Sequence, residues 1–481
     1  MLDVAIIGCG IVGAAAAFEL SKFELKVAVL EKENDIAAGT TKANSAIIHA
    51  GFDPEPGTLS ARLNVEGAKL AKEICKKLDV PYKQCGALVL AFSKEDLNTL
   101  EHLLENGNAN GVPDLEIIAG DQAREMEPNL SGDVTAALNV PTTGIVSPWE
   151  YALALAQIAA VNGVEIMRQC KVVAVDKVPG GFKISTTQGS IEARYILNAA
   201  GLGADDIHNM IAEPAFEILP NRGEYYLLDK SEGKVVERVI FQCPSNRFKG
   251  VLVAPTVHGN LIIGPNSENF GSRDDFSTSA GGLSGVMNTA KKSVPGLNFR
   301  ANIRNFAGLR AMTSSKDFII EEASGAKGFI NLAGIMSPGL SAAPAIAKMA
   351  CELLKGSGLK FKEKQNFRGG RKKIRFHRLT QQEKAALVAE NPAYGRVICR
   401  CETITEGEIL DALNSPIPPL SIDGVKRRAG TGMGRCQGGF CSPRLLEILA
   451  KHYGCDPTDV LQDLAGTYIL TSETKGAGLD I

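Results

Sequence analysis

Blocks of apolar residues, each followed by a glycine-rich turn and a helix-forming run, recur along the first three quarters of the chain. Residues 3–8 are mostly β-branched or apolar, and an alanine-rich helix-forming run follows at 14–20. A second apolar run, 26–30, ends in Glu31. Such continuous apolar runs are typical of parallel strands that helices cover on both faces of the sheet. The pattern predicts an α/β Rossmann-like domain at the start of the chain.

Three glycines, Gly8, Gly10 and Gly13, lie between the first predicted strand and its helix in the spacing G-x-G-x-x-G. In this motif the first glycine permits a tight turn, the second lets a pyrophosphate approach the backbone, and the third lets helix and strand pack closely. The free N–H groups of the helix N-terminus then face the phosphates. Glu31 can accept hydrogen bonds from an adenosine ribose. The spacing predicts dinucleotide binding, and a glycine-rich turn that serves packing alone is the alternative.

Two later segments favour FAD over NAD as the dinucleotide. Residues 195–201 read as another buried strand that ends in small residues. Residues 329–334 read as a strand that leads through 337–341 into a helix at 342–354. This second strand-to-helix junction suits a bound anionic or carbonyl group. An NAD domain has no need of a junction so far downstream, whereas a long flavin that lies across the sheet does.

In this order, the segments resemble the D-amino acid oxidase-type FAD-dependent oxidoreductase superfamily, which includes glycerol-3-phosphate dehydrogenases and L-2-hydroxyglutarate oxidases. The resemblance covers about the first 360 residues. The matching residues are Gly8, Gly10, Gly13, Glu31, Gly39-Thr-Thr-Lys-Ala-Asn-Ser-Ala-Ile-Ile-His-Ala-Gly51, Gly144-Ile-Val-Ser-Pro148, Arg222-Gly-Glu-Tyr-Tyr226, the Pro255–Pro265 region, Gly308-Leu-Arg310 and Gly334 with Ser337-Pro-Gly-Leu-Ser341.

The resemblance implies an FAD-binding domain built from 1–75, 145–210 and 305–360, with an inserted antiparallel β substrate-binding domain built from 76–144 and 211–304. It also implies which residues contact FAD. These are Gly8, Gly10, Ile11, Val12, Gly13, Glu31, Lys32, Thr40, Thr41, Asn44, Ser45, Val172, Ala200, Gly201, Gly334, Gly339, Leu340 and Ser341.

Composition narrows the class of protein further. Apolar residues make up 44% of the 481 residues, and 52 lysines and arginines face 54 aspartates and glutamates. This is a globular mix of multidomain length, and a net charge of -2 argues against a nucleic-acid partner. No apolar run approaches the length of a membrane helix, and no basic segment precedes the first apolar stretch. We therefore expect no transmembrane segment, no signal peptide and a cytoplasmic protein.

A basic segment separates the FAD-dependent part from the C-terminal region. Residues 362–378 contain eight lysines and arginines and one acidic residue, Glu363. We interpret 361–390 as a solvated linker or a strap over the first domain. A docking strip for an acidic partner is the alternative, and without an aromatic ladder nucleic-acid binding is disfavoured.

Four of the eleven cysteines, Cys399, Cys401, Cys436 and Cys441, cluster in a glycine-rich part of the C-terminal region. The other seven are scattered and read as buried free thiols of a reducing compartment. Four thiolates can hold zinc or an iron–sulfur cluster. The C-x-C spacing fits zinc poorly, and dense glycine favours a cluster because bare N–H groups can surround the sulfurs. Zinc or four idle thiols remain the alternatives.

The C-x-C pattern, a gap and then C-x-x-x-x-C also resemble the bacterioferritin-associated ferredoxin-like (BFD-like) [2Fe–2S] domain. The resemblance implies a small, mainly α domain over 391–481 whose four cysteines hold the cluster. Joined to the flavoprotein part, it is the arrangement of anaerobic glycerol-3-phosphate dehydrogenase large subunits and of related dye-linked amine dehydrogenases.

For the chemistry, His49 is the candidate base and Arg310 the candidate clamp for an anionic substrate. Arg222 and Tyr226 are weaker candidates, and His258 receives no role. We expect hydride transfer from glycerol 3-phosphate to FAD, giving dihydroxyacetone phosphate, with electrons leaving through the cluster.

Other functions remain open: oxidation of L-2-hydroxyglutarate or another 2-hydroxy acid, oxidation of an amino or imino acid, or service as an electron-transfer subunit. Residues 47–54 and Arg222-Gly-Glu-Tyr-Tyr226 look more like the L-2-hydroxyglutarate branch. The loop after Gly51 also lacks an Arg-Tyr pair, which argues against a phosphate-binding role for that loop. A redox partner subunit or a quinone-linked acceptor is the expected partner. Association with a membrane through that partner is the alternative to a purely cytoplasmic location.

Overall fold

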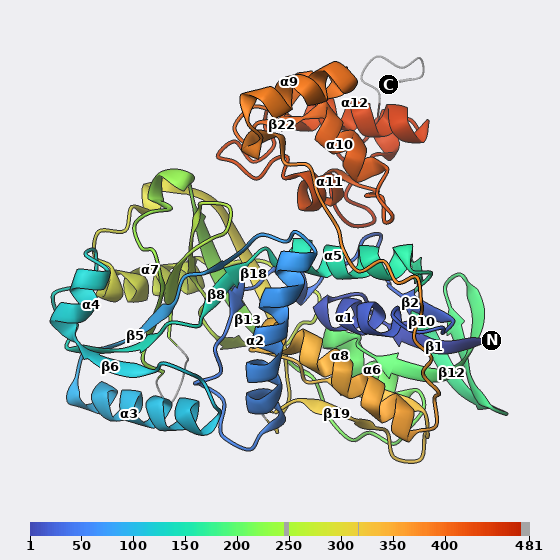
Figure 1. Ribbon diagram of the computed structural model, residues 1–481, viewed down its shortest axis with the longest axis horizontal. Helices are drawn as coiled ribbons and strands as arrows, with labels where there is room; N and C mark the ends of the chain where they lie inside the picture. Colours follow the sequence, from blue (N-terminus) through green and yellow to red (C-terminus); the bar gives the residue numbers. More distant parts are fainter. Residues whose placement is uncertain (245–249, 316, 473–481) are drawn as a thin grey trace, which may run out of the picture.

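The computed structural model describes residues 1–244, 250–315 and 317–472. Figure 1 shows two β-rich parts side by side and a smaller helical unit, coloured orange to red, above them. The nine C-terminal residues of the predicted 391–481 domain lie outside the described residues. In the described ranges no helix has the length and apolarity needed to cross a bilayer.

The first β-rich part is an eight-stranded mixed sheet. Strands β9, β2, β1, β12 and β20 pair in parallel, while β10, β11 and β19 add antiparallel pairs at its edges. The bounds are β1 Leu2–Ile7, β2 Val27–Leu30, β9 Glu165–Met167, β10 Val172–Val178, β11 Gly181–Thr186, β12 Gly189–Asn198, β19 Ile319–Glu322 and β20 Phe329–Ala333. The predicted Rossmann-like α/β fold is therefore present.

Helices α1 (Ile11–Leu20), α5 (Pro148–Val161) and α8 (Gly339–Gly356) pack together beside this sheet, with α2 (Leu59–Lys77) against α8 and the short α6 (Ala204–Asn209) near β20. Helix α1 is apolar around nearly its whole circumference, and it is accordingly buried in the core. Two glycines allow close packing. A Cβ on Gly13 would lie 2.0 Å from the Gly8 carbonyl oxygen, and one on Gly67 would lie 2.3 Å from the Ser341 carbonyl oxygen.

The second β-rich part is a nine-stranded sheet in the order β17-β13-β16-β15-β14-β5-β7-β6, with β18 paired to β13. Its pairs are antiparallel except β14 with β5. The bounds are β5 Ala87–Ala91, β6 Glu116–Ala119, β7 Ala136–Val140, β13 Leu219–Leu228, β14 Val239–Gln242, β15 Leu252–Pro255, β16 Leu261–Gly264, β17 Glu268–Asn269 and β18 Asn302–Met312, with helices α3 Lys94–Ala109, α4 Gly120–Met126 and α7 Ala280–Ser293.

One strand departs from the predicted division of the chain. Strand β18 pairs with β13 from Leu219↔Met312 to Leu228↔Asn302. Residues 305–312, which the sequence pattern grouped with the FAD-binding segments, therefore lie in the nine-stranded sheet. A small sheet of β3 (Ile47–Ile48), β8 (Gly144–Val146) and β4 (Tyr82–Gln84) connects the two β-rich parts.

The C-terminal unit is mainly helical, as predicted. It follows α9 (Gln381–Glu390), a helix at the end of the predicted linker, and it contains β21 Val397–Cys399, β22 Ile404–Thr405, α10 Glu406–Leu413, α11 Ile422–Ala429 and α12 Ser442–Tyr453. Its own apolar core includes Ile409, Val425 and Leu445. We call this part, residues 391–472, the C-terminal unit.

The basic segment between α8 and α9 is a strap that lies on the first β-rich part. Figure 1 shows it passing from the end of α8 across α5 to the C-terminal unit. The Glu150 carboxylate, buried in α5, contacts Arg371 at 3.0 Å, Lys373 at 3.2 Å and Arg375 at 2.6 Å. Burial would raise the pKa of Glu150, but these three cations outweigh it and lower the pKa. The basic residues therefore fasten the strap to α5.

Candidate functional site

The predicted dinucleotide motif lies where the carboxyl ends of β1, β2 and β12 meet. Gly8 has φ +95°, and a Cβ there would lie 2.6 Å from the Ala199 carbonyl oxygen. Only glycine fits this turn, because a side chain would clash and the φ is left-handed. Ala200 lies against Gly8, and Gly201 follows it. The turn delivers the chain to the N-terminus of α1 at Gly10, the geometry that a pyrophosphate needs.

Glu31 ends β2 and is 7% exposed. Its carboxylate accepts hydrogen bonds from the Cys9 N–H at 2.8 Å and the Glu33 N–H at 3.0 Å. Burial raises the pKa of Glu31. The Cys170 N–H donates to the Glu31 carbonyl oxygen, so the chain just before Val172 and β10 passes beside the backbone of Glu31. A buried carboxylate at this strand end fits the adenosine half of a dinucleotide.

The 3₁₀ helix Thr40–Lys42 joins α1 to the nine-stranded sheet. The Thr41 hydroxyl accepts a hydrogen bond from the Ile11 N–H at 2.9 Å. The Thr40 hydroxyl donates to the Leu309 carbonyl oxygen of β18 at 2.7 Å. The Asn44 amide donates to the carbonyl oxygens of Thr40 and Thr41, and the Ser45 hydroxyl lies 3.2 Å from the Tyr225 hydroxyl. This segment therefore lies between the helix N-terminus and the second sheet.

The third predicted segment follows β20. Gly334 has φ +64°, and α8 begins at Gly339. Leu340 packs against the helical core, and the buried Ser341 hydroxyl accepts a hydrogen bond from the His49 N–H at 2.8 Å. The structure thus gathers most predicted FAD residues at one sheet edge.

Lys32 is the predicted contact that points away from this edge. Its side chain is 59% exposed, and its ammonium lies 3.4 Å from the Glu33 carboxylate. Its contact with the dinucleotide stays a prediction.

His49 lies directly after β3, in a small pocket lined also by Phe52, Asp53, Asn64 and Pro338. Its ring is 5.6 Å from the Phe241 ring of β14, centroid to centroid. With the Asn64 amide in its better orientation, Asn64 donates to the His49 carbonyl oxygen and accepts from the Gly51 N–H. The backbone of this histidine is therefore fixed from two sides.

Arg310 lies on β18 opposite Asn221 of β13. Its guanidinium donates to the Asn221 amide oxygen and, at 3.3 Å, to the Asn266 carbonyl oxygen. A Cβ on Gly223 would lie 2.6 Å from Arg310 Nη2, so glycine makes room for this side chain. Both acceptors are neutral groups. They hold the Arg310 guanidinium in a fixed direction without neutralising its charge.

The weaker candidates have structural contacts. Arg222 pairs with Glu268 at 2.7 Å and lies over the Phe270 ring, while the Tyr226 ring packs edge-on against Phe299. His258 lies away from the dinucleotide residues, stacked on Trp149 beside the strap.

The four clustered cysteines converge in the C-terminal unit. The sulfur of Cys401 lies 3.8 Å from the sulfurs of both Cys399 and Cys436, and the Cys399 thiol donates to the Cys441 sulfur. All four are free of disulfides. Cys399 and Cys441 are buried, whereas Cys401 is exposed.

Backbone N–H groups surround these sulfurs. Gly438 and Phe440 donate to Cys436, and Gly432 donates to Cys399 and Cys441. A Cβ on Gly434 would lie 2.5 Å from the Cys401 sulfur. Such donors stabilise the negative charge of a cysteine-bound cluster, so the residues present fit a [2Fe–2S] group.

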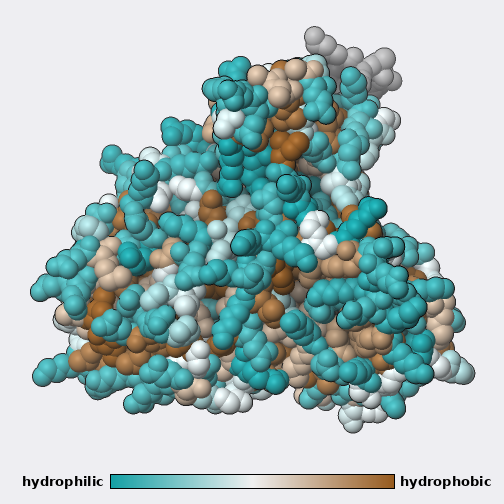
Figure 2. All heavy atoms as spheres, in the orientation of Figure 1, coloured by the Kyte–Doolittle hydropathy of each residue, from teal (hydrophilic) through white to brown (hydrophobic). Residues whose placement is uncertain are grey.

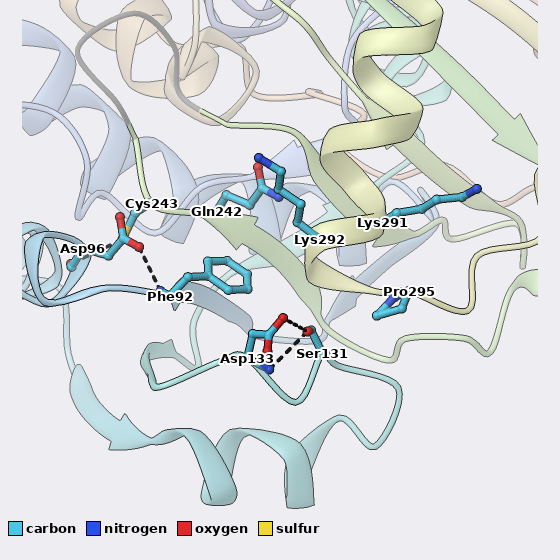
Figure 3. Close-up of a pocket in the computed structure, with 9 residues that line it drawn as sticks. All are labelled: Phe92, Asp96, Ser131, Asp133, Gln242, Cys243, Lys291, Lys292 and Pro295. Carbon is cyan, nitrogen blue, oxygen red and sulfur yellow. Dashed lines mark hydrogen bonds between the residues drawn. The ribbon is translucent and has the colours of Figure 1, made fainter.

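A larger pocket of about 480 Å³ lies between the start of α3 and the end of α7 (Figure 3). Its lining mixes Asp96 and Asp133 with Lys291 and Lys292 and includes none of the predicted site residues. The predicted site residues therefore do not form this pocket.

Sequence reasoning missed Asn221 and Asn64, which orient the two candidate catalytic residues. Asn221 directly precedes the quoted Arg222-Gly-Glu segment. Only the β13–β18 register places it opposite Arg310. No sequence signal for that register was available.

Two family models match the chain. Residues 3–353 match the DAO family of FAD dependent oxidoreductases, and residues 397–451 match the BFD-like [2Fe-2S] binding domain. Both resemblances predicted from the motifs are thereby confirmed.

The chain is similar along almost its whole length to a glycerol 3-phosphate dehydrogenase of Caloramator mitchellensis, with 50% identity over 99% of both chains. It is 35% identical to the human mitochondrial L-2-hydroxyglutarate dehydrogenase over 55% of this chain and 60% of that protein. Among solved structures it resembles the FAD-bound L-α-glycerophosphate oxidase of Mycoplasma pneumoniae, with a TM-score of 0.73, 31% identity, and coverage of 78% of this chain and 99% of that one.

Proposed function

The chain belongs to the DAO family of FAD dependent oxidoreductases, and we propose that it oxidises glycerol 3-phosphate to dihydroxyacetone phosphate. FAD and a [2Fe–2S] cluster are its cofactors. The observation that carries the proposal is the match, through both cofactor regions, to a relative that is a glycerol 3-phosphate dehydrogenase.

Arg310 would bind the anionic end of the substrate. Its neutral acceptors on Asn221 and Asn266 fix its direction. The guanidinium charge then remains available to a phosphate, whose oxygens match its planar fork. This supports an anionic substrate over an uncharged alcohol.

His49 would take the proton of the substrate hydroxyl onto a ring nitrogen. An imidazole titrates near neutral pH and suits this duty. The backbone N–H of His49 donates to the Ser341 hydroxyl at the start of α8, and Ser341 is also a predicted flavin contact. The base and the flavin-binding segments would therefore share one support.

Bound FAD would supply the acceptor for the hydrogen and electron pair that leave the substrate carbon, and the cluster would supply single-electron transfer. The cysteines differ in exposure, since Cys399 and Cys441 are buried while Cys401 is exposed. Phe440, next to Cys441, is 80% exposed. We propose that a redox partner protein or a quinone-linked acceptor takes up the electrons at this exposed side.

A 2-hydroxy acid is the second candidate substrate, because the chain is also similar to an L-2-hydroxyglutarate dehydrogenase. A carboxylate would bind Arg310 by the same fork geometry. The two substrates therefore differ in the fit of the anion and the length of the carbon chain rather than in the predicted catalytic groups.

Anaerobic stopped-flow mixing distinguishes these substrates. Glycerol 3-phosphate should bleach the flavin absorbance at the lowest concentration, ahead of L-2-hydroxyglutarate, amino acids and the uncharged control glycerol. If a 2-hydroxy acid or an amino acid bleaches the flavin faster, that compound and not glycerol 3-phosphate is the substrate. Bleaching by none of them would favour an electron-transfer subunit.

A further inference from the structure

The segment 31–42 lies between the dinucleotide motif and the C-terminal unit. On its inner side, Glu31 accepts from the Cys9 N–H and Thr41 accepts from the Ile11 N–H. These are contacts to the turn and to the N-terminus of α1. The outer side of the same segment binds the C-terminal unit at two points.

The first point is an ion cluster around Asp35, which is 1% exposed. Arg428 of α11 donates to both carboxylate oxygens, at 2.7 and 2.8 Å, and Arg427 donates at 2.8 Å. Burial would raise the pKa of Asp35, but Arg428 and Arg427 outweigh it and hold the pKa well below its usual range. A buried carboxylate bound by two cations is costly to uncover, because it would be left unpaired.

The second point is Asp463, in the loop that follows α12. Its carboxylate lies 2.7 Å from the Lys42 ammonium and 2.7 Å from Arg427 Nη1. The Asn34 amide also donates to the Asp463 carbonyl oxygen at 2.7 Å. Asp463 therefore links both ends of the segment, through Asn34 and Lys42, to the arginine that binds Asp35.

We propose that the C-terminal unit is part of the FAD site, with Asp463 as a positioning residue that holds the segment 31–42, and with it Glu31 and Thr41, against the turn and helix that bind the dinucleotide. This role rests on FAD as the cofactor and is the same for any of the candidate substrates. Figure 1 shows α11 directly above α5 and the first β-rich part, where such a contact is made.

Coupling of this kind is reciprocal. If docking of the C-terminal unit strengthens FAD binding, bound FAD must strengthen docking by the same factor. Couplings between sites usually change affinity by about 5- to 150-fold. A loss of FAD affinity within that range is expected when the link through Asp463 is removed.

Asp463→Asn tests the proposal, because it removes the charge while retaining the shape and the backbone contact. The full chain is stripped of FAD and retitrated, and bound FAD is followed by the quenching of its fluorescence. The dissociation constant should rise about 5- to 150-fold, with the iron content unchanged. Glu447→Gln is the matched control, since it removes an exposed ion pair with Arg444 in the same unit.

Lys42→Met removes the same ion pair from the other side and covers the case in which Asp463→Asn folds poorly. Combined with Asp463→Asn, it should weaken FAD binding less than the two single effects multiplied together, because both changes break one contact. If folded Asp463→Asn and Lys42→Met proteins bind FAD as tightly as the unmodified chain, the proposal is wrong. This titration contains no substrate, so failure of the proposed glycerol 3-phosphate activity would leave its outcome unaffected.

Discussion

At the scale of single residues, the partners of Arg310 determine how strongly the site can bind an anion. An aspartate in place of Asn221 would keep the tether but would neutralise the guanidinium. We therefore expect Asn221→Asp to raise the glycerol 3-phosphate concentration needed for half-maximal flavin reduction by about 10- to 100-fold. This corresponds to a loss of about 1.4 to 2.8 kcal/mol of binding free energy. The limiting rate at saturation should change less.

The matched control for this change is Asn269→Asp. Asn269 accepts a hydrogen bond from the Asn221 amide, so the variant adds the same charge beside Asn221 rather than beside Arg310. It should have a much smaller effect on substrate binding. Equal effects of the two variants would show that general electrostatics, rather than the contact with Arg310, controls anion binding.

The second prediction at this scale concerns His49. Replacing it by alanine should slow flavin reduction by substrate about 10²- to 10⁴-fold, the usual contribution of a positioned base. Anaerobic stopped-flow spectra measure this rate, and the same spectra report the FAD content. His102→Ala, an exposed histidine on α3, should keep the native rate. A native rate in His49→Ala across a range of pH would place the base elsewhere.

The residues of the dinucleotide motif were predictable because each carries a local requirement. Gly8 needs a left-handed φ, and Glu31 ends a strand beside the motif. Asn221 was not predictable in the same way. Asn221 and Arg310 are 89 positions apart, and their contact depends on the register of two strands, which tertiary packing sets.

At the scale of elements, the strap places several cations around one buried carboxylate and one histidine. His258 stacks on Trp149 with ring centroids 5.8 Å apart, and its Nε2 is buried without a hydrogen-bond partner among the described residues. Burial lowers the pKa of His258 to about 4, as do the charges of Lys373, Lys230 and Arg378, while Glu150 raises it. The histidine is therefore neutral in the folded protein at neutral pH.

This predicts a loss of stability in mild acid. Between pH 6.5 and 4 the unfolded chain binds a proton at His258 that the folded chain does not, so the free energy of unfolding falls as the pH falls. The contribution is at most about 3 kcal/mol, since one unit of pKa corresponds to 1.36 kcal/mol. Urea unfolding at pH 7 and pH 5, followed by the fluorescence of the single tryptophan, measures it.

His258→Gln should lose less stability between these two pH values than the unmodified protein, because glutamine does not titrate. An identical loss in both proteins would assign the acid sensitivity to another group at the strap, such as Glu150, whose pKa its three cations lower.

The charge of the basic segment indicated a strap, but the sequence did not indicate that Glu150 is the residue to which the strap binds. Eight basic residues in a short segment predict either a solvated linker or a contact with acidic groups. Glu150 lies within a helix whose other positions are mostly apolar, so nothing in its local sequence pattern marks it as the partner of a segment more than 200 residues away.

At the scale of the whole molecule, the C-terminal unit has an apolar core of its own and adds Ile417 to the core of the first β-rich part, so loss of the cluster should leave the FAD-binding core folded. Cys436→Ser should lose iron and acid-labile sulfide while retaining most of its FAD, because the cluster needs four thiolates. Iron analysis and the flavin spectrum of anaerobically purified protein measure the two contents. Cys455→Ser, a cysteine of the same unit outside the cluster, should retain both.

Stoichiometric zinc without iron in the reconstituted protein would contradict this prediction. In the unmodified chain, flavin reduction by substrate should be followed by rapid transfer to a dye. In Cys436→Ser, the first step should remain fast and the delivery of electrons should become slow.

The sequence predicted both halves of the molecule, because each carries its own motif: the glycine fingerprint in one and the cysteine spacing in the other. It did not predict how they dock. Asp35 and Arg428 are separated by most of the chain, and neither lies in a motif. Docking of two units depends on surface complementarity, which a single sequence does not reveal.

The strap gives the contact between the units a property that two separate chains would lack. Because a short covalent connection joins them, the C-terminal unit meets its docking surface at an effective concentration in about the millimolar range. The contact would therefore be insensitive to dilution of the protein, and a few ion pairs could maintain it although they would be too weak to hold free partners together. Fastening the strap to Glu150 shortens the free part of the connection further. If the unit comes away, it can travel only a short distance and will return before an unrelated protein of the cell can take its place.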